Sequence, residues 1–73
     1  MKKTYKILNL DCGHCALKLQ DKLNKIEGVN VEIFFMNEKI IIDIADGLDE
    51  SEKLQEIKAT VKKFDPYCKI MGV

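Results

Sequence analysis

Apolar and polar residues alternate in three short stretches of the chain. Residues 5–10 (YKILNL), 31–36 (VEIFFM) and 39–45 (KIIIDIA) show period-two alternation or are rich in β-branched and aromatic residues. Both properties favour strands. In the third stretch Ile40, Ile42 and Ile44 share one face. The polar pair Asn37–Glu38 predicts a hairpin turn between the last two of these strands.

Two other stretches repeat their apolar residues with helical spacing. A first helix is expected from about Cys15 to Glu27, closed by Gly28, and a second is expected from Asp49 to Asp65–Pro66. Each helix carries an apolar stripe at i, i+3, i+7 and i+10. The stripe residues are Ala16, Leu19, Leu23 and Ile26 in the first helix, and Leu54, Ile57, Val61 and Phe64 in the second.

Asp49 is the predicted N-cap of the second helix, with Glu52 as its capping partner three residues later. A short strand over Cys68–Gly72 completes the order βαββαβ. This order predicts an α+β, ferredoxin-like sandwich: a four-stranded antiparallel sheet with both helices on one face, formed by residues 1–73 as a single domain. In that fold Leu10–Asp11 lies near Tyr67–Cys68, because the last strand runs antiparallel beside the first.

The charge balance narrows the classes of partner. Twelve acidic residues offset twelve lysines, and the chain has no arginine. These features argue against a phosphate-reading site and against nucleic acid as the partner. The third predicted strand, KIIIDIA, also lacks the aromatic residues of RNA-binding sandwiches. We find neither a signal peptide nor an apolar run of membrane-spanning length, and expect a cytoplasmic monomer without membrane insertion.

The stretch LDCGHC, residues 10–15, concentrates the chemistry. Cys12 and Cys15 are spaced so that both sulfurs can turn to one point where a loop enters a helix. The helix start stabilises a thiolate, which is the form that binds soft metals. The same feature would activate a redox cysteine, so the spacing alone leaves metal binding and thiol–disulfide exchange open.

The surroundings of the CxxC pair argue against a thioredoxin-like oxidoreductase. The chain has no tryptophan before the pair, and its one proline, Pro66, follows a helix instead of facing the cysteines. A phosphate hydrolase on this fold would need an arginine, which is absent. We therefore interpret the CGHC tetrapeptide as a metal motif.

The chain resembles the heavy-metal-associated domain over essentially its whole length. The resemblance lies in a strand followed by LDCGHC, a helix that begins CALKLQ, and an EGV after that helix. That family carries the motif GMxCxxC and includes cytosolic metallochaperones and N-terminal domains of metal-transporting P-type ATPases. The resemblance implies that Cys12 and Cys15 are metal ligands. It also implies that Leu10 packs under the loop in place of the usual methionine, while Asn9 replaces the usual glycine.

Asp11 differs from the residue that copper-binding members of the family carry at this position, and this difference bears on the choice of metal. The resemblance associates aspartate at this position with zinc, cadmium and lead exporters, and threonine or serine with copper members. Two thiolates suffice for Cu⁺, whereas Zn²⁺ favours about four ligands and accepts a carboxylate. Asp11 is therefore a candidate third ligand, although it could equally cap the helix through N–H groups of Gly13 or His14.

Three further residues are candidates for an extra ligand or for contacts around the site: His14, Tyr67 and Cys68. His14 lies between the cysteines, and we expect its side chain to point away from the converging sulfurs. Tyr67 or Phe64 is expected near the metal loop by the resemblance. Cys68 would follow Tyr67 into the last strand, where we favour a small buried apolar residue over a third thiolate.

The hypothesis is a metal-transfer module. It binds Zn²⁺, Cd²⁺ or Pb²⁺ at an exposed DCxxC loop and passes the ion by ligand exchange to a metal-transporting P-type ATPase, in the same chain or a separate one. A Cu⁺ chaperone or copper-ATPase domain is the first alternative, and a thiol–disulfide oxidoreductase is the remoter one. We expect no catalytic residue in this segment.

Overall fold

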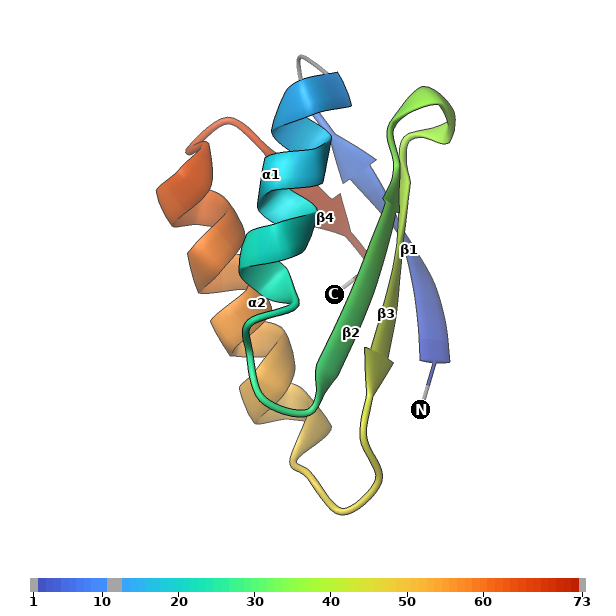
Figure 1. The fold of residues 1–73 in the computed structure, drawn as a ribbon, viewed down its shortest axis with the longest axis vertical. Helices are drawn as coiled ribbons and strands as arrows, with labels where there is room; N and C mark the ends of the chain where they lie inside the picture. The colour runs from blue at the N-terminus through green and yellow to red at the C-terminus, as the bar shows by residue number, and fades with distance from the viewer. Residues whose placement is uncertain (1, 11–12, 73) are drawn as a thin grey trace.

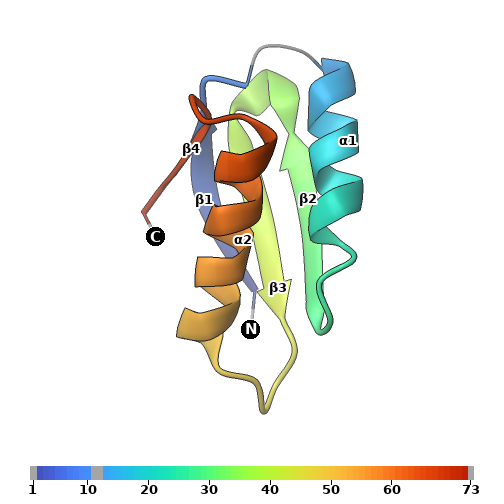
Figure 2. The same ribbon diagram turned by 90° about the vertical axis from the view of Figure 1, so that its left-hand side faces the viewer.

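The computed structural model describes residues 2–10 and 13–72. Their elements are, in order, β1 (Lys2–Leu8), α1 (Gly13–Leu23), β2 (Val29–Phe34), a 3-10 turn η1 (Phe35–Asn37), β3 (Lys39–Ile44), α2 (Glu50–Phe64) and β4 (Lys69–Met71). The strands form one antiparallel sheet in the order β2-β3-β1-β4. Both helices cover the same face of it (Figures 1 and 2). The predicted ferredoxin-like sandwich is confirmed.

The core lies between that face and the helices. Ile40, Ile42 and Ile44 of β3 are at most 4% exposed, as their alternation predicts. Ile42 stands opposite Val31 of β2, which is buried on the same face. Both helical stripes contribute, with Leu19, Leu23, Ile57 and Val61 buried and Ile26, Leu54 and Phe64 packed against the core. Burying each large aliphatic side chain contributes roughly 1.5–3 kcal/mol, so these stripes hold the helices on the sheet.

The ends of β1 differ from the predicted 5–10. The strand begins at Lys2 and ends at Leu8, because Lys2–Lys6 pair with Lys39–Asp43 of β3 and Asn9 then leaves the extended conformation. The first residues of β1 are polar and show no alternation of apolar and polar positions. The start of the strand is therefore visible only from its pairing with β3. β4 is also shorter than predicted, Lys69–Met71 instead of 68–72, since its pairing with β1 covers three residues.

Helix α1 ends four residues earlier than the predicted Glu27. After Leu23 the backbone turns more tightly: the N–H groups of Lys25 and Ile26 donate to carbonyls three residues back. Gly28 then takes a φ of 77°, a left-handed value that glycine adopts without strain. The next strand, β2, consequently covers 29–34 instead of the predicted 31–36, and the predicted hairpin turn is the 3-10 turn Phe35–Asn37 followed by Glu38.

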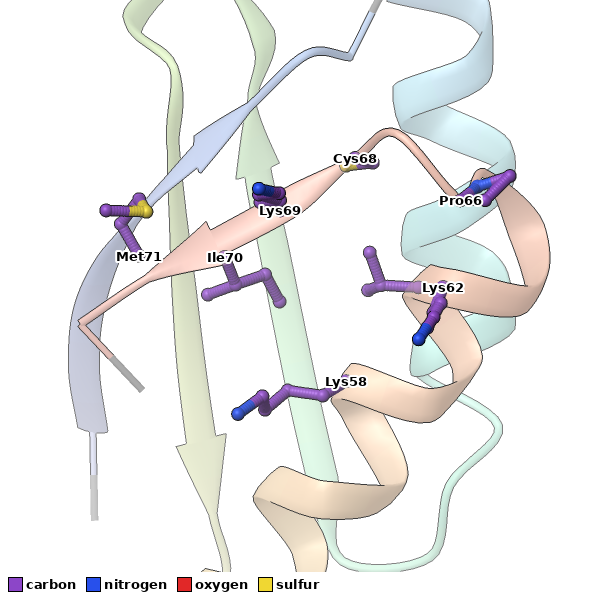
Figure 3. Close-up of a pocket in the computed structure, with 8 residues that line it drawn as sticks. Lys58, Lys62, Pro66, Cys68, Lys69, Ile70 and Met71 are labelled. Carbon is purple, nitrogen blue, oxygen red and sulfur yellow. The ribbon is translucent and has the colours of Figure 1, made fainter.

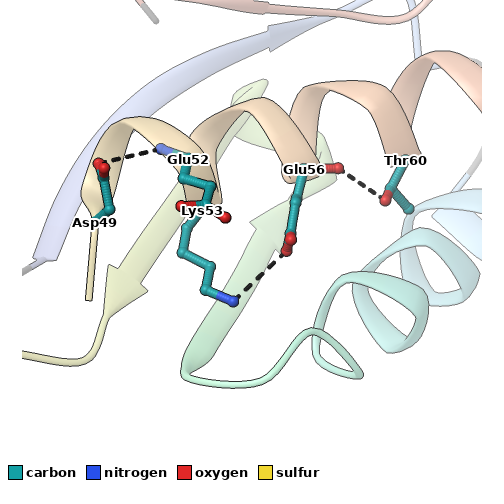
Figure 4. A network of polar contacts seen from close by, with 5 residues as sticks. All are labelled: Asp49, Glu52, Lys53, Glu56 and Thr60. Atoms are coloured by element: carbon teal, nitrogen blue, oxygen red, sulfur yellow. Dashed lines mark hydrogen bonds and ion pairs between the residues drawn. The ribbon is translucent and has the colours of Figure 1, made fainter.

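Helix α2 has the predicted start and end. The Asp49 Oδ1 accepts a hydrogen bond from the Glu52 N–H at 3.3 Å, which satisfies one of the unpaired donors of the first turn (Figure 4). Farther along, Lys53 forms an ion pair with Glu56 at 3.7 Å, and the Thr60 hydroxyl donates to the Glu56 carbonyl at 2.9 Å. The helix ends at Phe64, before Asp65–Pro66.

Candidate metal-binding site

The loop that carries the cysteine pair begins at Asn9, directly after β1. Asn9 has a φ of 64°, in the left-handed region. Glycine adopts this region most easily, and asparagine is among the residues that tolerate it next best. Its Nδ2 donates a hydrogen bond to the Tyr67 carbonyl at 3.0 Å. This contact confirms that the end of the first strand lies beside the start of the last one. It also gives a physical reason why asparagine serves where the family motif has glycine.

Leu10 lies next in the chain and is partly buried, packed against the hydrophobic core. It therefore packs inward, as expected for a residue that replaces the motif's methionine. Asp11 and Cys12, on which the ligand predictions depend most, lie outside the described residues. Their role as ligands stays a prediction.

The first residue of α1 lies near the hairpin between β2 and β3. A Cβ placed on Gly13, the first residue of α1, would stand 3.7 Å from the Phe35 ring carbon Cδ2. Phe35 belongs to the 3-10 turn and is half-buried. Sequence reasoning placed Phe35 within a strand and gave it no role at the site.

Cys15 is the third residue of α1 and is half-buried. The first turn of a helix has unpaired N–H groups and the positive end of the helix dipole, and both stabilise a thiolate. In this structure Cys15 is disulfide-bonded. A thiolate is the species that ligates metal, so reduction of this cysteine must precede metal binding through it.

The other candidates differ in exposure. His14 is exposed on the first turn of α1, and Tyr67 is 77% exposed in the turn before β4. Cys68 is 5% exposed and belongs to the hydrophobic core cluster. Phe64, the other aromatic expected near the loop, is partly buried against the core. Within residues 2–10 and 13–72, no three histidine, cysteine or acidic side chains gather closely enough to hold a metal ion.

Exposed apolar side chains surround this end of the molecule. Met36, in the 3-10 turn, is 87% exposed, and Leu17, one turn into α1, is 61% exposed. Tyr67 stands on the other flank, beside Asn9. The starts of α1 and β4 and the β2–β3 hairpin lie at the same end of the fold (Figure 1).

The family model of the heavy-metal-associated domain matches residues 4–65. The chain belongs to the heavy-metal-associated domain family. Metal binding in this family is a property of a small module, and the larger proteins that carry such modules include transport ATPases. For the helices of the described residues, none is both long and apolar enough to cross a membrane.

Two curated relatives are cadmium, zinc and cobalt-transporting ATPases. The one from Helicobacter pylori (strain ATCC 700392 / 26695) is 33% identical over 67 residues, which are 90% of this chain and 9% of the relative. The one from Bacillus subtilis (strain 168) is 28% identical over 71 residues, 96% of this chain and 10% of the relative. The heavy-metal-associated chain thus spans about a tenth of the length of these relatives.

Solved structures with the same fold are described with both copper and zinc. The CopZ metallochaperone superposes with a TM-score of 0.73 at 18% identity, covering 97% of this chain and 100% of that one. The N-terminal domain of a potential copper-translocating P-type ATPase from Bacillus subtilis, in a Cu(I)-loaded state, gives 0.63 at 26% identity over 81% and 76%. The N-terminal domain of ZntA in the Zn(II) form gives 0.71 at 20% identity over 99% and 93%.

Proposed function

We propose that residues 1–73 act as one heavy-metal-associated domain that binds Zn²⁺, Cd²⁺ or Pb²⁺ through Cys12, Cys15 and Asp11. The observation that carries the proposal is the position of the DCxxC sequence. It bridges the anchored end of β1 and the first turn of α1, where Cys15 lies. The helix start favours a thiolate at Cys15, and Asp11 adds the carboxylate that a divalent ion accepts more readily than Cu⁺ does.

The domain then passes its ion to a partner by ligand exchange. Two described residues lie in or near the DCxxC sequence at one end of the molecule: Asn9, which is hydrogen-bonded to the Tyr67 carbonyl, and Gly13, which lies near Phe35. Their positions support the proposal that this end presents the ion to a partner. The exposed side chains of Met36, Leu17 and Tyr67 offer a partner apolar contacts around that end. The partner we propose is the transport portion of a metal-transporting P-type ATPase, in the same chain or in a separate one. The transport ATPases among the relatives support this choice.

Cu⁺ is the second candidate cargo. It is supported by the 26% identity to an ATPase domain that was solved in its Cu(I)-loaded state. Two thiolates alone satisfy Cu⁺ in linear coordination, so this reading needs Cys12 and Cys15 but gives Asp11 no ligand role. Asp11 would then serve only as a helix cap.

A competition titration separates the two cargoes. The fully reduced protein is titrated with Zn²⁺, Cd²⁺, Pb²⁺ and Cu⁺ against chelators of known affinity, together with Asp11→Ala and Asp11→Asn. We expect both variants to lose at least about tenfold in affinity for the divalent ions and to change little for Cu⁺. The double variant Cys12→Ser/Cys15→Ser is the control that removes both thiolates and should abolish binding of all four ions.

Equal affinities for the divalent ions in wild type and both Asp11 variants would make the carboxylate a cap and favour copper. Adding Cys68→Ser counts the sulfurs: unchanged affinity identifies Cys68 as a core residue only. The redox alternative has its own assay, catalytic reduction of the insulin disulfides by a reductant. Turnover above the uncatalysed rate would replace metal transfer as the function of the cysteine pair.

A further inference from the structure

The two edge strands of the sheet, β2 and β4, differ in what lies against their outer side. At the β2 edge, the side chains of Gln20 in α1 and Asn24 just after it bind the outward-facing backbone groups of the strand. The Val31 N–H donates to Asn24 Oδ1 at 2.6 Å, the Val31 carbonyl accepts from Asn24 Nδ2 at 3.1 Å, and the Ile33 N–H donates to Gln20 Oε1 at 2.9 Å. An incoming strand would have to displace these bonds, so this edge is closed to pairing.

The β4 edge borders an open groove. β4 pairs with β1 along one side, and on the other side a cavity of about 360 Å³ separates it from α2 (Figure 3). Val61 of α2 and Ile70 of β4 give the cavity an apolar wall on each side, and Met71, 49% exposed, lies at the end of the strand. The groove therefore combines a strand edge with apolar side chains from two elements.

Three lysines make this groove positively charged. Lys58 and Lys62 line it from α2 and Lys69 lines it from β4, and no acidic residue is among the described residues that line it (Figure 3). Two lysines outside the groove form ion pairs, Lys3 with Glu50 and Lys53 with Glu56. Within residues 2–10 and 13–72, no carboxylate forms an ion pair with the three groove lysines. In a chain of zero net charge, this is a local basic site.

We propose that the groove between α2 and β4 binds an extended acidic segment of a partner polypeptide. The segment lies along the free side of β4, with carboxylates at Lys58, Lys62 and Lys69 and an apolar side chain between Val61 and Ile70. Alternating acidic and apolar residues suit this arrangement, because successive side chains of an extended chain point to opposite faces.

The lysines also account for selectivity. A short edge strand that carries lysine resists pairing with apolar or basic strands, because their approach would desolvate an unpaired ammonium group. An acidic segment removes that penalty by supplying the counter-charge. The proposal does not depend on metal binding, since the described residues that line the groove belong to α2, β4 and the turn between them.

The test uses the reduced, metal-free protein and the synthetic peptide acetyl-Glu-Val-Glu-Val-Glu-amide, followed by amide chemical shifts in ¹⁵N NMR. We expect shift changes confined to residues 58–62 and 68–71. The triple variant Lys58→Gln/Lys62→Gln/Lys69→Gln should weaken binding by about tenfold. The matched control, Lys18→Gln/Lys22→Gln/Lys25→Gln on α1, removes the same charge elsewhere and should leave the dissociation constant within about twofold.

Three results would overturn the proposal. One is the absence of shift changes at millimolar peptide. Another is an equal loss of binding in both triple variants, which would mean attraction to overall charge instead of to the groove. The third is that tripolyphosphate produces the same shifts as the peptide, which would make the site a general anion patch. Native-like spectra of both triple variants establish that each is folded before the comparison is made.

Discussion

The side-chain amide of Asn24 forms two hydrogen bonds with the backbone of Val31, accepting one and donating the other. The Asn24 amide oxygen accepts from the Val31 N–H at 2.6 Å, and its amide nitrogen donates to the Val31 carbonyl at 3.1 Å. One side chain thus lies where α1 ends, spans the turn to β2 and occupies the free backbone groups of an edge strand. The position just after Leu23 allows this, because the chain reverses between the two residues.

Replacing Asn24 with alanine leaves two backbone groups of Val31 without these partners. We expect Asn24→Ala to lower the free energy of unfolding by about 1–3 kcal/mol, measured by urea denaturation of the reduced protein. Gln20→Ala removes one bond, to the Ile33 N–H, and should cost about 1 kcal/mol. Lys25→Ala, at the exposed next position, is the control and should stay within about 0.5 kcal/mol. Equal stabilities of Asn24→Ala and Lys25→Ala would refute the role of the paired bonds.

Substitutions at Asn9 separate its backbone conformation from its hydrogen bond. Asn9→Gly keeps the left-handed φ of 64° readily and loses only the bond to the Tyr67 carbonyl, at a cost of about 0.5–1.5 kcal/mol. Asn9→Val also strains the backbone and should lose about 1–2 kcal/mol more. Denaturation measures both, and equal losses would show that the backbone conformation contributes nothing.

Gly28 and Gly47 both have positive φ but differ in their surroundings. A Cβ on Gly28 would collide with Leu48 Cδ1, whereas a Cβ on Gly47 meets no heavy atom within 4 Å. We expect Gly47→Ala to cost about 1–2 kcal/mol from backbone strain alone, and Gly28→Ala to cost more because Leu48 must also move. Thermal denaturation compares the two. A Gly28→Ala variant no less stable than Gly47→Ala would show that Leu48 shifts without cost.

Leu19 and Leu17 form a matched pair on α1. Leu19 is 0% exposed in the core, and Leu17 is 61% exposed. We expect Leu19→Ala to destabilise the fold by about 2–5 kcal/mol through lost burial and a cavity. Leu17→Ala should change stability by less than about 0.5 kcal/mol. We also expect Leu17→Ala to slow metal transfer to the proposed partner ATPase, which a stopped-flow transfer assay measures.

Lys3 and Glu50 join β1 to the start of α2 through an ion pair of 2.9 Å. The hydrogen bond and the charge of Glu50 raise the pKa of Lys3 above its ordinary 10.5. Because the folded-state pKa is raised, the contribution to stability is complete below pH 10.5 and disappears as pH rises through the folded-state pKa of Lys3. Glu50→Gln should return the pKa of Lys3 toward 10.5, as followed by NMR titration of its side-chain signals. An unchanged titration would contradict the pair.

The amino-acid sequence by itself determined the order of elements, both helical stripes, the buried face of β3 and the cap of α2. These features depend on neighbours a few residues apart, and local spacing records them. The stripe Leu54, Ile57, Val61 and Phe64 and the cap Asp49 are where the pattern places them, because helix burial and capping follow from period and side-chain chemistry. The spacing of Cys12 and Cys15 left metal binding and thiol–disulfide exchange open, and the residues around the pair favoured metal binding.

Only the tertiary structure decided which distant residues meet. Asn9 reaches the Tyr67 carbonyl 58 residues away, Gly13 lies near Phe35, and Asn24 binds Val31. The ends of β1 and β4 likewise depend on the strands with which they pair. The groove beside β4 joins residues of a helix and a strand that share no sequence period. Such contacts arise when the packed core brings elements together, so the spacing along the chain carries no record of them.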